Sequence, residues 1–230
     1  MEFFYPLIDL IRRKKPLTQK QFVEKLQSND YDLRRRRFIN VDLRGIELAQ
    51  FKLQESDLRF ARNLSQAVFP GAILTKCDLR GCNLSGINLS QTILSGARLQ
   101  NVNLSRSACI KANFSYAKLH KANCTGTIFS GTNLSHIKFN RTNLVGARLD
   151  RTNLTKADFS WANINWCDFS NANLARVRFW GNLPGSINFH NTSLDEEQMK
   201  QARRDVRSIV SPGMSLKDIL FGNYPTGRKR

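Results

Sequence analysis

The sequence predicts an all-β solenoid, and two observations carry that prediction. From residue 64 to residue 194 every fifth residue is Leu, Phe, Ile or Cys, with Pro184 as the one exception. The residue two places before each of these centres is mostly small or β-branched, as at Ala67, Thr92 and Val102. A period of five fits neither a helix nor a strand, but in extended chain the two positions point to the same side. Each five therefore supplies one large and one small inward side chain and then turns a corner, so that the chain coils around its own core.

The repeat also has a recognisable motif. Residues 112–131 read, in fives, ANFSY AKLHK ANCTG TIFSG. This pattern resembles the A(D/N)LXX motif of the pentapeptide repeat family over about residues 31–194. The resemblance implies a right-handed quadrilateral parallel β-helix of about eight coils, with four fives in each coil. Asparagine precedes the centre at residues 83, 103, 123, 143 and 163, and again at 113, 133, 153 and 173. A coil of twenty residues would place these asparagines on opposite faces, where stacked amides can form ladders.

We expect three segments: an N-terminal helical cap or docking segment at 1–30, the β-helix at 31–194, and C-terminal helices with a basic tail at 195–230. Thr18 and Gln21 form a capping box that predicts a helix to about residue 27, and Ser193 and Glu196 form another that predicts a helix to about residue 209. Solenoids need caps at both ends. The apolar residues 3–10 leave three alternatives open: packing in the cap over the first coil, docking to a partner, or anchoring at a membrane interface.

The repeat is irregular near its ends. An early run of centres (Leu33, Phe38, Leu43, Leu48, Leu53 and Leu58) stands in a different register, which indicates one residue inserted near 59–63, as a bulge or corner insertion. Pro184 should loosen its corner. Arg36 falls on an inward position, which an unpaired arginine cannot occupy. We therefore expect an incomplete first coil, with the arginine run solvated on its rim.

The chain carries 36 Lys and Arg against 18 Asp and Glu, a net charge of +18, which favours anionic partners. One predicted face holds Arg98, Lys118, Lys138 and Arg178, with Asp158 between them, and Lys121 and Arg141 stand at the next corner with Trp161 and Trp180 nearby. The other candidate patch is the run Arg34, Arg35, Arg36 and Arg37. Arginine and aromatic residues are enriched at protein interfaces, and cations interleaved with aromatics also suit single-stranded nucleic acid. The alternative for both patches is an ordinary solvated surface.

The sequence predicts no catalytic site, cofactor or metal. The histidines at 120, 136 and 190 are isolated, and Asp57, Asp78, Asp158 and Asp168 occupy the Asn/Asp slot of the motif, where a carboxylate bonds nearby backbone amides. The five cysteines, at 77, 82, 109, 124 and 167, all fall on inward positions without disulfide or metal spacing. We therefore expect a reducing compartment such as the cytoplasm.

The function that fits best is a non-enzymatic interaction scaffold with a protein partner. Binding of the basic face to nucleic acid or to an anionic membrane surface is the main alternative. The resemblance also implies other roles, among them topoisomerase protection by DNA mimicry, a secreted effector, and a homodimer through the C-terminal end. A DNA mimic must be anionic, so the charge of this chain has the wrong sign for that role.

Overall fold

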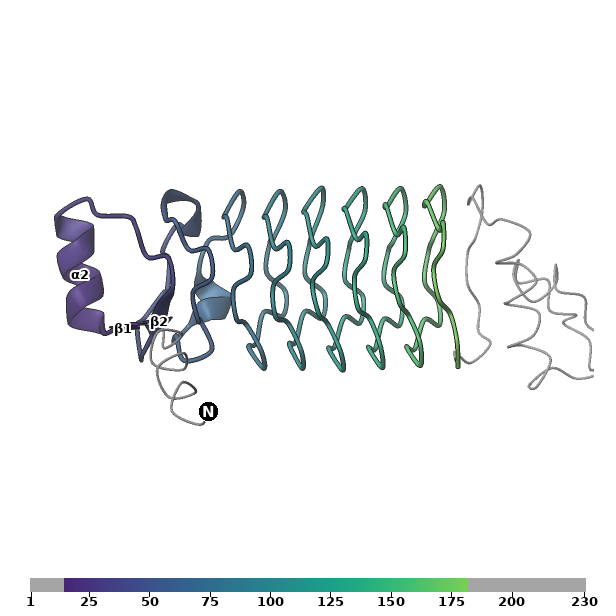
Figure 1. The fold of residues 1–230 in the computed structure, drawn as a ribbon, viewed down its shortest axis with the longest axis horizontal. Helices are drawn as coiled ribbons and strands as arrows, with labels where there is room; N and C mark the ends of the chain where they lie inside the picture. Colours follow the sequence, from purple (N-terminus) through teal and green to yellow (C-terminus); the bar gives the residue numbers. More distant parts are fainter. Residues whose placement is uncertain (1–14, 182–230) are drawn as a thin grey trace, which may run out of the picture.

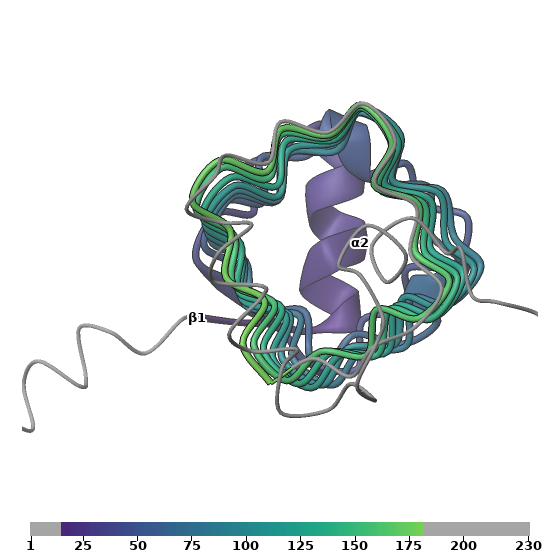
Figure 2. The same cartoon turned by 90° about the vertical axis from the view of Figure 1, so that its right-hand side faces the viewer.

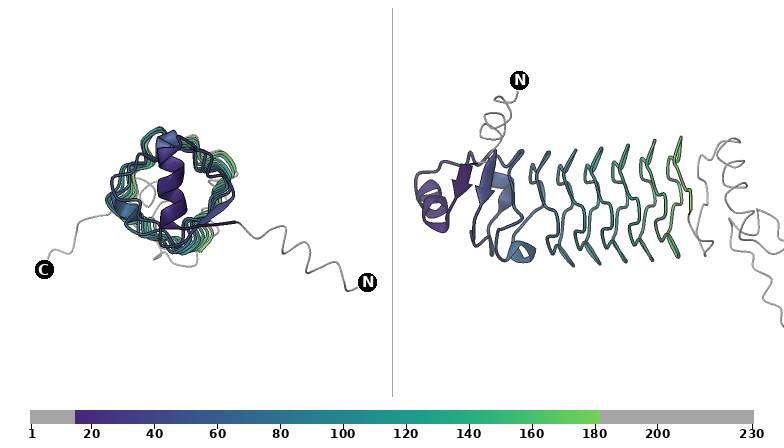
Figure 3. Two further views of the ribbon diagram at one scale, coloured as in Figure 1. Left: turned by 90° about the vertical axis from the view of Figure 1, so that its left-hand side faces the viewer. Right: turned by 60° about the horizontal axis from the view of Figure 1, so that its bottom comes forward.

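The computed structural model describes residues 15–181, which form a stack of coils along one axis (Figure 1). The coils superpose when viewed along that axis, and helix α2 (Gln19–Gln27) lies across one open end (Figures 2 and 3). Strand β1 (Lys15–Leu17) precedes α2, and strand β2 (Arg36–Phe38) follows it. Two short 3-10 turns, η1 (Leu48–Gln50) and η2 (Leu64–Gln66), interrupt the early coils.

Neighbouring coils are joined by parallel pairing, at a spacing of twenty residues from Ile73 onward. The pair β1 and β2 starts the stack with Leu17 opposite Phe38, and single bridges such as Asn83 to Asn103 and Asn103 to Asn123 continue it. At each bridge two backbone hydrogen bonds join a residue to the preceding coil; the N–H of Asn103 donates to the carbonyl of Cys82 at 3.0 Å, and the carbonyl of Asn103 accepts from the N–H of Leu84 at 2.7 Å. The predicted twenty-residue register and the two asparagine columns are therefore confirmed. Rungs of the amide ladder are present between Asn83, Asn103 and Asn123, at 3.2 and 3.3 Å.

The corners between fives share one backbone geometry. The N–H of the residue three after a centre bonds the carbonyl of that centre, as from Ala97 to Leu94 at 3.0 Å. The residue two after the centre has positive φ, as at Lys121 (59°) and Arg141 (57°). A type II turn requires this geometry at its third position. The asparagine or aspartate before the centre accepts the N–H two residues later, as predicted, for example from Ser160 to Asp158 at 3.0 Å.

The core is a column of inward centres. Those from residue 33 to residue 174 are buried, and the phenylalanine rings at 114, 129, 139, 159 and 169 contact one another at centroid distances of 5.0 to 5.8 Å. Polar residues at the small inward position donate to backbone carbonyls, Ser107 and Thr152 within their own coil and others to the neighbouring coil. Thr132 donates to the carbonyl of Cys109, and Thr142 to that of Leu119, both at 2.7 Å. The core therefore holds hydroxyl groups without leaving them unbonded.

The N-terminal helix is confirmed, with Gln21 N–H donating to Thr18 Oγ1 at 3.4 Å and Thr18 N–H donating to Gln21 Oε1 at 3.1 Å. Its Phe22 is buried, with its ring 5.8 Å from that of Phe51 and 6.3 Å from that of Phe38. Helix α2 therefore packs against the first coil through Phe22. The predicted C-terminal helices, Pro184 and the last repeats lie outside the described residues.

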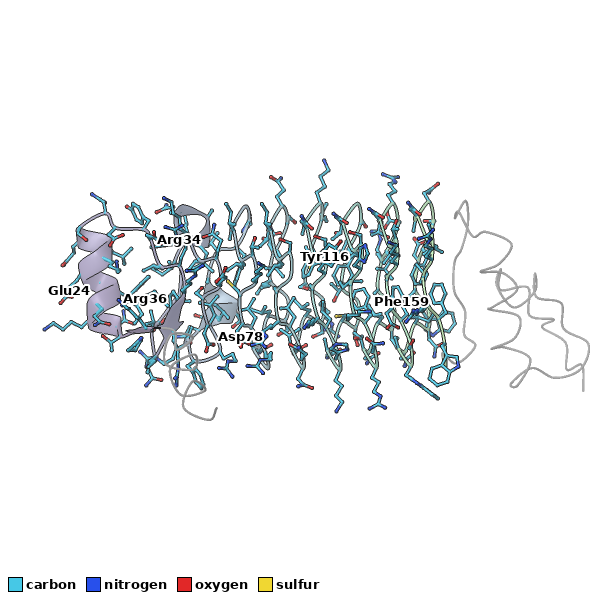
Figure 4. All side chains as sticks on the ribbon, viewed as in Figure 1. Glu24, Arg34, Arg36, Asp78, Tyr116 and Phe159 are labelled. Atoms are coloured by element: carbon cyan, nitrogen blue, oxygen red, sulfur yellow. The ribbon has the colours of Figure 1, made fainter. Side chains whose placement is uncertain are left out.

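Two expectations about the first coils need correction. The stack begins earlier than the repeat, because β1 adds a strand whose Leu17 is fully buried. Arg36 is half-buried between α2 and the coils rather than solvated (Figure 4), and its guanidinium donates to the carbonyl of Pro16 at 3.0 Å. The inserted residue is confirmed. Pairing changes from twenty at Asp42 and Arg62 to twenty-one at Glu47 and Val68, across η2.

Candidate binding face

One side of the stack carries most of the predicted interaction residues. Its central column consists of residues joined coil to coil by bridges: Arg37, Asp57, Asp78, Arg98, Lys118, Lys138, Asp158 and Arg178. The predicted column of Arg98, Lys118, Lys138 and Arg178, interrupted by Asp158, is therefore one continuous line. We call the outward residues of this side, with its two bordering corners, the basic face.

Its bordering corners are further columns. One corner holds Phe60, Asn101, Lys121, Arg141 and Trp161, whose backbone N–H groups or carbonyls join successive coils. The other holds Arg35, Glu55, Lys76, Tyr116, His136, Lys156 and Arg176, all with positive φ. A row of mainly polar residues that includes Gln100, His120 and Asn140 runs between the central column and the first corner. The basic face is therefore a flat strip of cations edged by cations and aromatics.

At its N-terminal end the acids and arginines form a compact cluster. Arg80 binds Asp78 through two hydrogen bonds of 2.8 Å each, and Arg59 binds Asp57 at 3.0 and 2.8 Å. Arg59 and Arg98 also approach Asp78, at 3.5 and 3.7 Å. Burial alone would raise the pKa of Asp78, but the hydrogen bonds from Arg80 and the charge of Arg59 hold it below its usual range. These acids are consequently neutralised by their own arginines.

Farther along the face the cations have fewer partners. Lys118, Lys121 and Arg141 are exposed, and Lys138 Nζ lies 3.7 Å from Asp158. Burial would raise the pKa of Asp158, but hydrogen bonds from Ser160 and Asn140 and the charge of Lys138 lower it. The carboxylate is therefore ionised at neutral pH and offsets only part of this positive charge.

His120 lies within this cationic strip and was wrongly predicted to be isolated. Burial, together with the nearby charges of Lys118 and Lys138, lowers its pKa, because each disfavours the protonated ring. The imidazole is therefore neutral at neutral pH and can both donate and accept a hydrogen bond.

Aromatic side chains stand at both bordering corners of the face, and Trp180 stands in the row that includes Gln100, His120 and Asn140. Trp161 and Trp180 are 53% and 56% exposed and meet edge to face with centroids 4.9 Å apart. Tyr116 is 59% exposed and stacks on His136 at 4.4 Å, so His136 is not isolated either. Phe60 is 45% exposed, with the guanidinium groups of Arg37 and Arg59 4.9 and 5.1 Å from its centroid.

The predicted arginine run does not act as one patch. Arg37 belongs to the central column and Arg35 to a bordering corner, where Arg35 Nε lies 3.0 Å from Glu55. Arg34 is bound by Asp32, and Arg36 is turned inward. The structure thus brings Arg35 and Arg37 onto the same face as Arg98 and Lys118, although the sequence pattern predicted two separate patches.

Several residues of the face were not predicted: Arg59, Phe60, Arg80, Tyr116 and His136. Phe60 was missed because the inserted residue changes its register. It stands twenty-one rather than twenty positions before Gly81, the next residue of the same corner. Trp166, at 68% the most exposed of the described large apolar side chains, was also missed and stands at a different corner.

Other chemistry within residues 15–181 is sparse. No group of three or more His, Cys, Asp or Glu there could hold a metal ion. No described helix has the length and apolar character needed to cross a bilayer. The five cysteines are free, and burial raises the pKa of Cys109 and of Cys167 to about 12. These thiols are core residues, as predicted, although Cys82 is only half-buried.

Comparisons with known proteins bear on the repeat. A model described as a pentapeptide repeat region matches residues 72–149, and one described as pentapeptide repeats in eight copies matches residues 132–171. No curated protein gives a significant match.

Several solved structures are similar to this chain. A trypsin-treated variant of QnrB1, a plasmid-mediated fluoroquinolone resistance protein, is 18% identical with a TM-score of 0.44, covering 75% of this chain and 87% of its own. HetL, a pentapeptide repeat protein involved in heterocyst differentiation regulation from the cyanobacterium Nostoc sp. strain PCC 7120, is 18% identical with a TM-score of 0.30, covering 77% and 95%. A pentapeptide repeat protein of the Arabidopsis thaliana thylakoid lumen is 25% identical with a TM-score of 0.20, covering 61% and 91%.

Proposed function

Because the chain belongs to the pentapeptide repeat family, we propose that it is a non-enzymatic scaffold whose macromolecular partner docks on the basic face. The observation that carries the proposal is the register of that face. Bridges twenty residues apart align Arg98, Lys118 and Lys138 on successive coils. The backbone fixes the spacing of these charges at about 4.8 Å per coil, so an anionic partner meets a preorganised surface.

Two further features support a binding role over a catalytic one. The carboxylates of Asp57, Asp78 and Asp158 on this face accept hydrogen bonds from arginines or from turn residues. They are tied to the scaffold instead of being presented to a substrate. The described thiols are mostly buried, with raised pKa values where a shift is resolved, and so are poor nucleophiles.

The finer architecture is part of the same proposal. Family membership supports a right-handed quadrilateral β-helix, and the twenty-residue register supports four fives in each coil. Helix α2 supports a helical N-terminal cap. A reducing compartment such as the cytoplasm also belongs to the proposal, supported by five cysteines that form no disulfide.

The test uses two matched double variants. Lys121→Glu with Arg141→Glu reverses two exposed corner charges beside the basic face. Lys111→Glu with Arg151→Glu makes the same change at the diagonally opposite corner, where φ is also positive (55° and 56°). We expect macromolecules retained from native lysate by the wild-type chain to be retained by the Lys111 and Arg151 variant and lost by the other. Equal retention by both variants, or equal loss, would contradict the proposal.

A further inference from the structure

The basic face has features that select among anionic partners, and we infer that it binds a single-stranded polynucleotide along its length. The inference rests on the proposed function, because it names the partner of the same face. Three observations carry it: aligned cations, aromatic residues at both edges, and polar side chains between them.

The aligned cations supply contacts to phosphates. Lys118, Lys121 and Arg141 are exposed, and Arg98 and Lys138 approach their acids only at 3.7 Å. Cations that follow one line across successive coils match a partner whose charges also repeat along a line. A polynucleotide has this regularity, with one phosphate about every 3.4 Å of a stacked strand.

The aromatic residues supply stacking surfaces. Trp161 and Trp180 lie at one end of the face, Phe60 at the other, and Tyr116 between them on the opposite edge. Five coil rises separate Phe60 from Trp161, or about 24 Å at about 4.8 Å per rise, which accommodates roughly seven stacked nucleotides. Bases stack on aromatic side chains only when they are unpaired, so this arrangement favours a single strand over a duplex.

The polar residues argue against a lipid surface. Gln100, His120 and Asn140 fill the strip between the cation column and the Lys121 corner, and all three are half-buried. A membrane-binding face needs a continuous apolar area that sinks below the headgroups. Here the middle of the face offers amide and imidazole groups, which suit phosphates and base edges. The neutral imidazole of His120 can accept as well as donate.

The experiment measures binding of the full-length protein to fluorescein-labelled oligo(U) and oligo(dT) by anisotropy, at lengths of 4, 8 and 12 nucleotides. Affinity should rise steeply up to about 8 nucleotides and then level off. With about five phosphate contacts, log K should fall with log salt at a slope of about −3.5. Each phosphate contact contributes about 0.7 to the salt slope, so losing two contacts lowers log K at about 0.1 M salt by about 1.4. Lys121→Glu with Arg141→Glu should therefore weaken binding roughly 25-fold at about 0.1 M salt. Lys111→Glu with Arg151→Glu should leave affinity within about twofold of its wild-type value, and an equal loss in both would overturn the inference.

The aromatic contribution has its own matched pair. Trp161→Ala should lower affinity about 5-fold or more, as expected when a stacking platform is removed. Trp166→Ala should have little effect, because Trp166 occupies the same corner position (φ 63° against 60°) away from the basic face. Far-ultraviolet circular dichroism establishes that both variants fold.

Other partners give distinguishable outcomes. Equal affinity for duplex DNA of the same length, or binding to vesicles of phosphatidylcholine and phosphatidylserine without binding to oligonucleotides, would overturn the inference. If oligonucleotides do not bind but retention from lysate still depends on Lys121 and Arg141, the inference fails and the proposed function stands. If retention of macromolecules from lysate is also independent of Lys121 and Arg141, the proposed function fails too.

Discussion

The buried carboxylate of Asp78 should contribute to stability through its charge, which Asp78→Asn removes at nearly constant shape. The asparagine can still accept the backbone N–H of Arg80, now at 3.3 Å, so the turn survives. What is lost is the charge that binds Arg80 at 2.8 Å and faces Arg59 at 3.5 Å. The side chain of Asp78 is only 4% exposed.

The expected loss is about 2 kcal/mol at neutral pH. Removing one partner of a fully buried pair costs about 3–5 kcal/mol, but the side chains of Arg59 and Arg80 are 32% and 38% exposed. Water therefore solvates part of the orphaned charge and reduces that figure. For a chain of this size, about 2 kcal/mol corresponds to a decrease in Tm of roughly 4–8 °C.

The pH dependence tests the cause. The folded pKa of Asp78 is depressed, so its stabilisation is present above the unfolded value of about 3.9 and is lost as pH falls toward the folded pKa. Urea unfolding of the wild-type protein and the variant at pH 7, 5, 4 and 3 should show a difference that is constant down to about pH 5 and then shrinks. Asp158→Asn, at the equivalent turn position, should cost less, because Lys138 Nζ lies 3.7 Å from its carboxylate whereas Arg80 binds Asp78 at 2.8 Å. A difference that persists unchanged at pH 3 would refute the electrostatic account.

Three other outcomes are expected. Phe139→Ala should lower the free energy of unfolding by about 3–5 kcal/mol in urea titrations, since its fully buried ring contacts rings on neighbouring coils; a cost below about 1 kcal/mol would mean that the core collapses around the cavity. Gly181→Ala should alter the near-ultraviolet circular dichroism of Trp161, because the new Cβ would lie 2.6 Å from the indole ring at φ 70°, and an unchanged spectrum would contradict the packing. In native protein Cys109 should react with a thiol reagent far more slowly than in urea, whereas half-buried Cys82 should react first; equal native rates would contradict the burial.

The inward half of the fold could be predicted because each five carries its own signal. A large centre and a small partner alternate with a fixed period, and the buried centres follow that pattern from Leu33 to Leu174. Strand β1 could not be predicted in this way. It has three residues, of which only Leu17 is buried, and three residues contain no period. Its place in the stack depends on pairing with β2, a tertiary contact that local sequence does not encode.

The outward half was predictable only where the register was unbroken. Lys118 and Lys138 are twenty residues apart and were correctly placed on one face, whereas the insertion before η2 displaced Arg59 and Phe60 by one position. Since a face is defined by exact register, one inserted residue moved these side chains off the predicted columns. The pairing of Asp57 with Asp78 across that insertion restores them to the basic face.

The corners show how neighbouring coils constrain one another beyond the core. At several corners a long side chain lies over a glycine twenty residues later. Lys76 Cγ would lie 3.3 Å from a Cβ at residue 96, and Arg106 and Lys111 stand in the same relation to residues 126 and 131, each at 3.8 Å. Trp161 leaves least room, and it packs directly on Gly181. The left-handed conformation favours glycine at every corner, yet large residues stand at many corners, and these four side chains lie over a glycine of the following coil. At these corners the missing Cβ of the glycine leaves room for the stems of Lys76, Arg106 and Lys111 and for the indole of Trp161 to lie against the next coil.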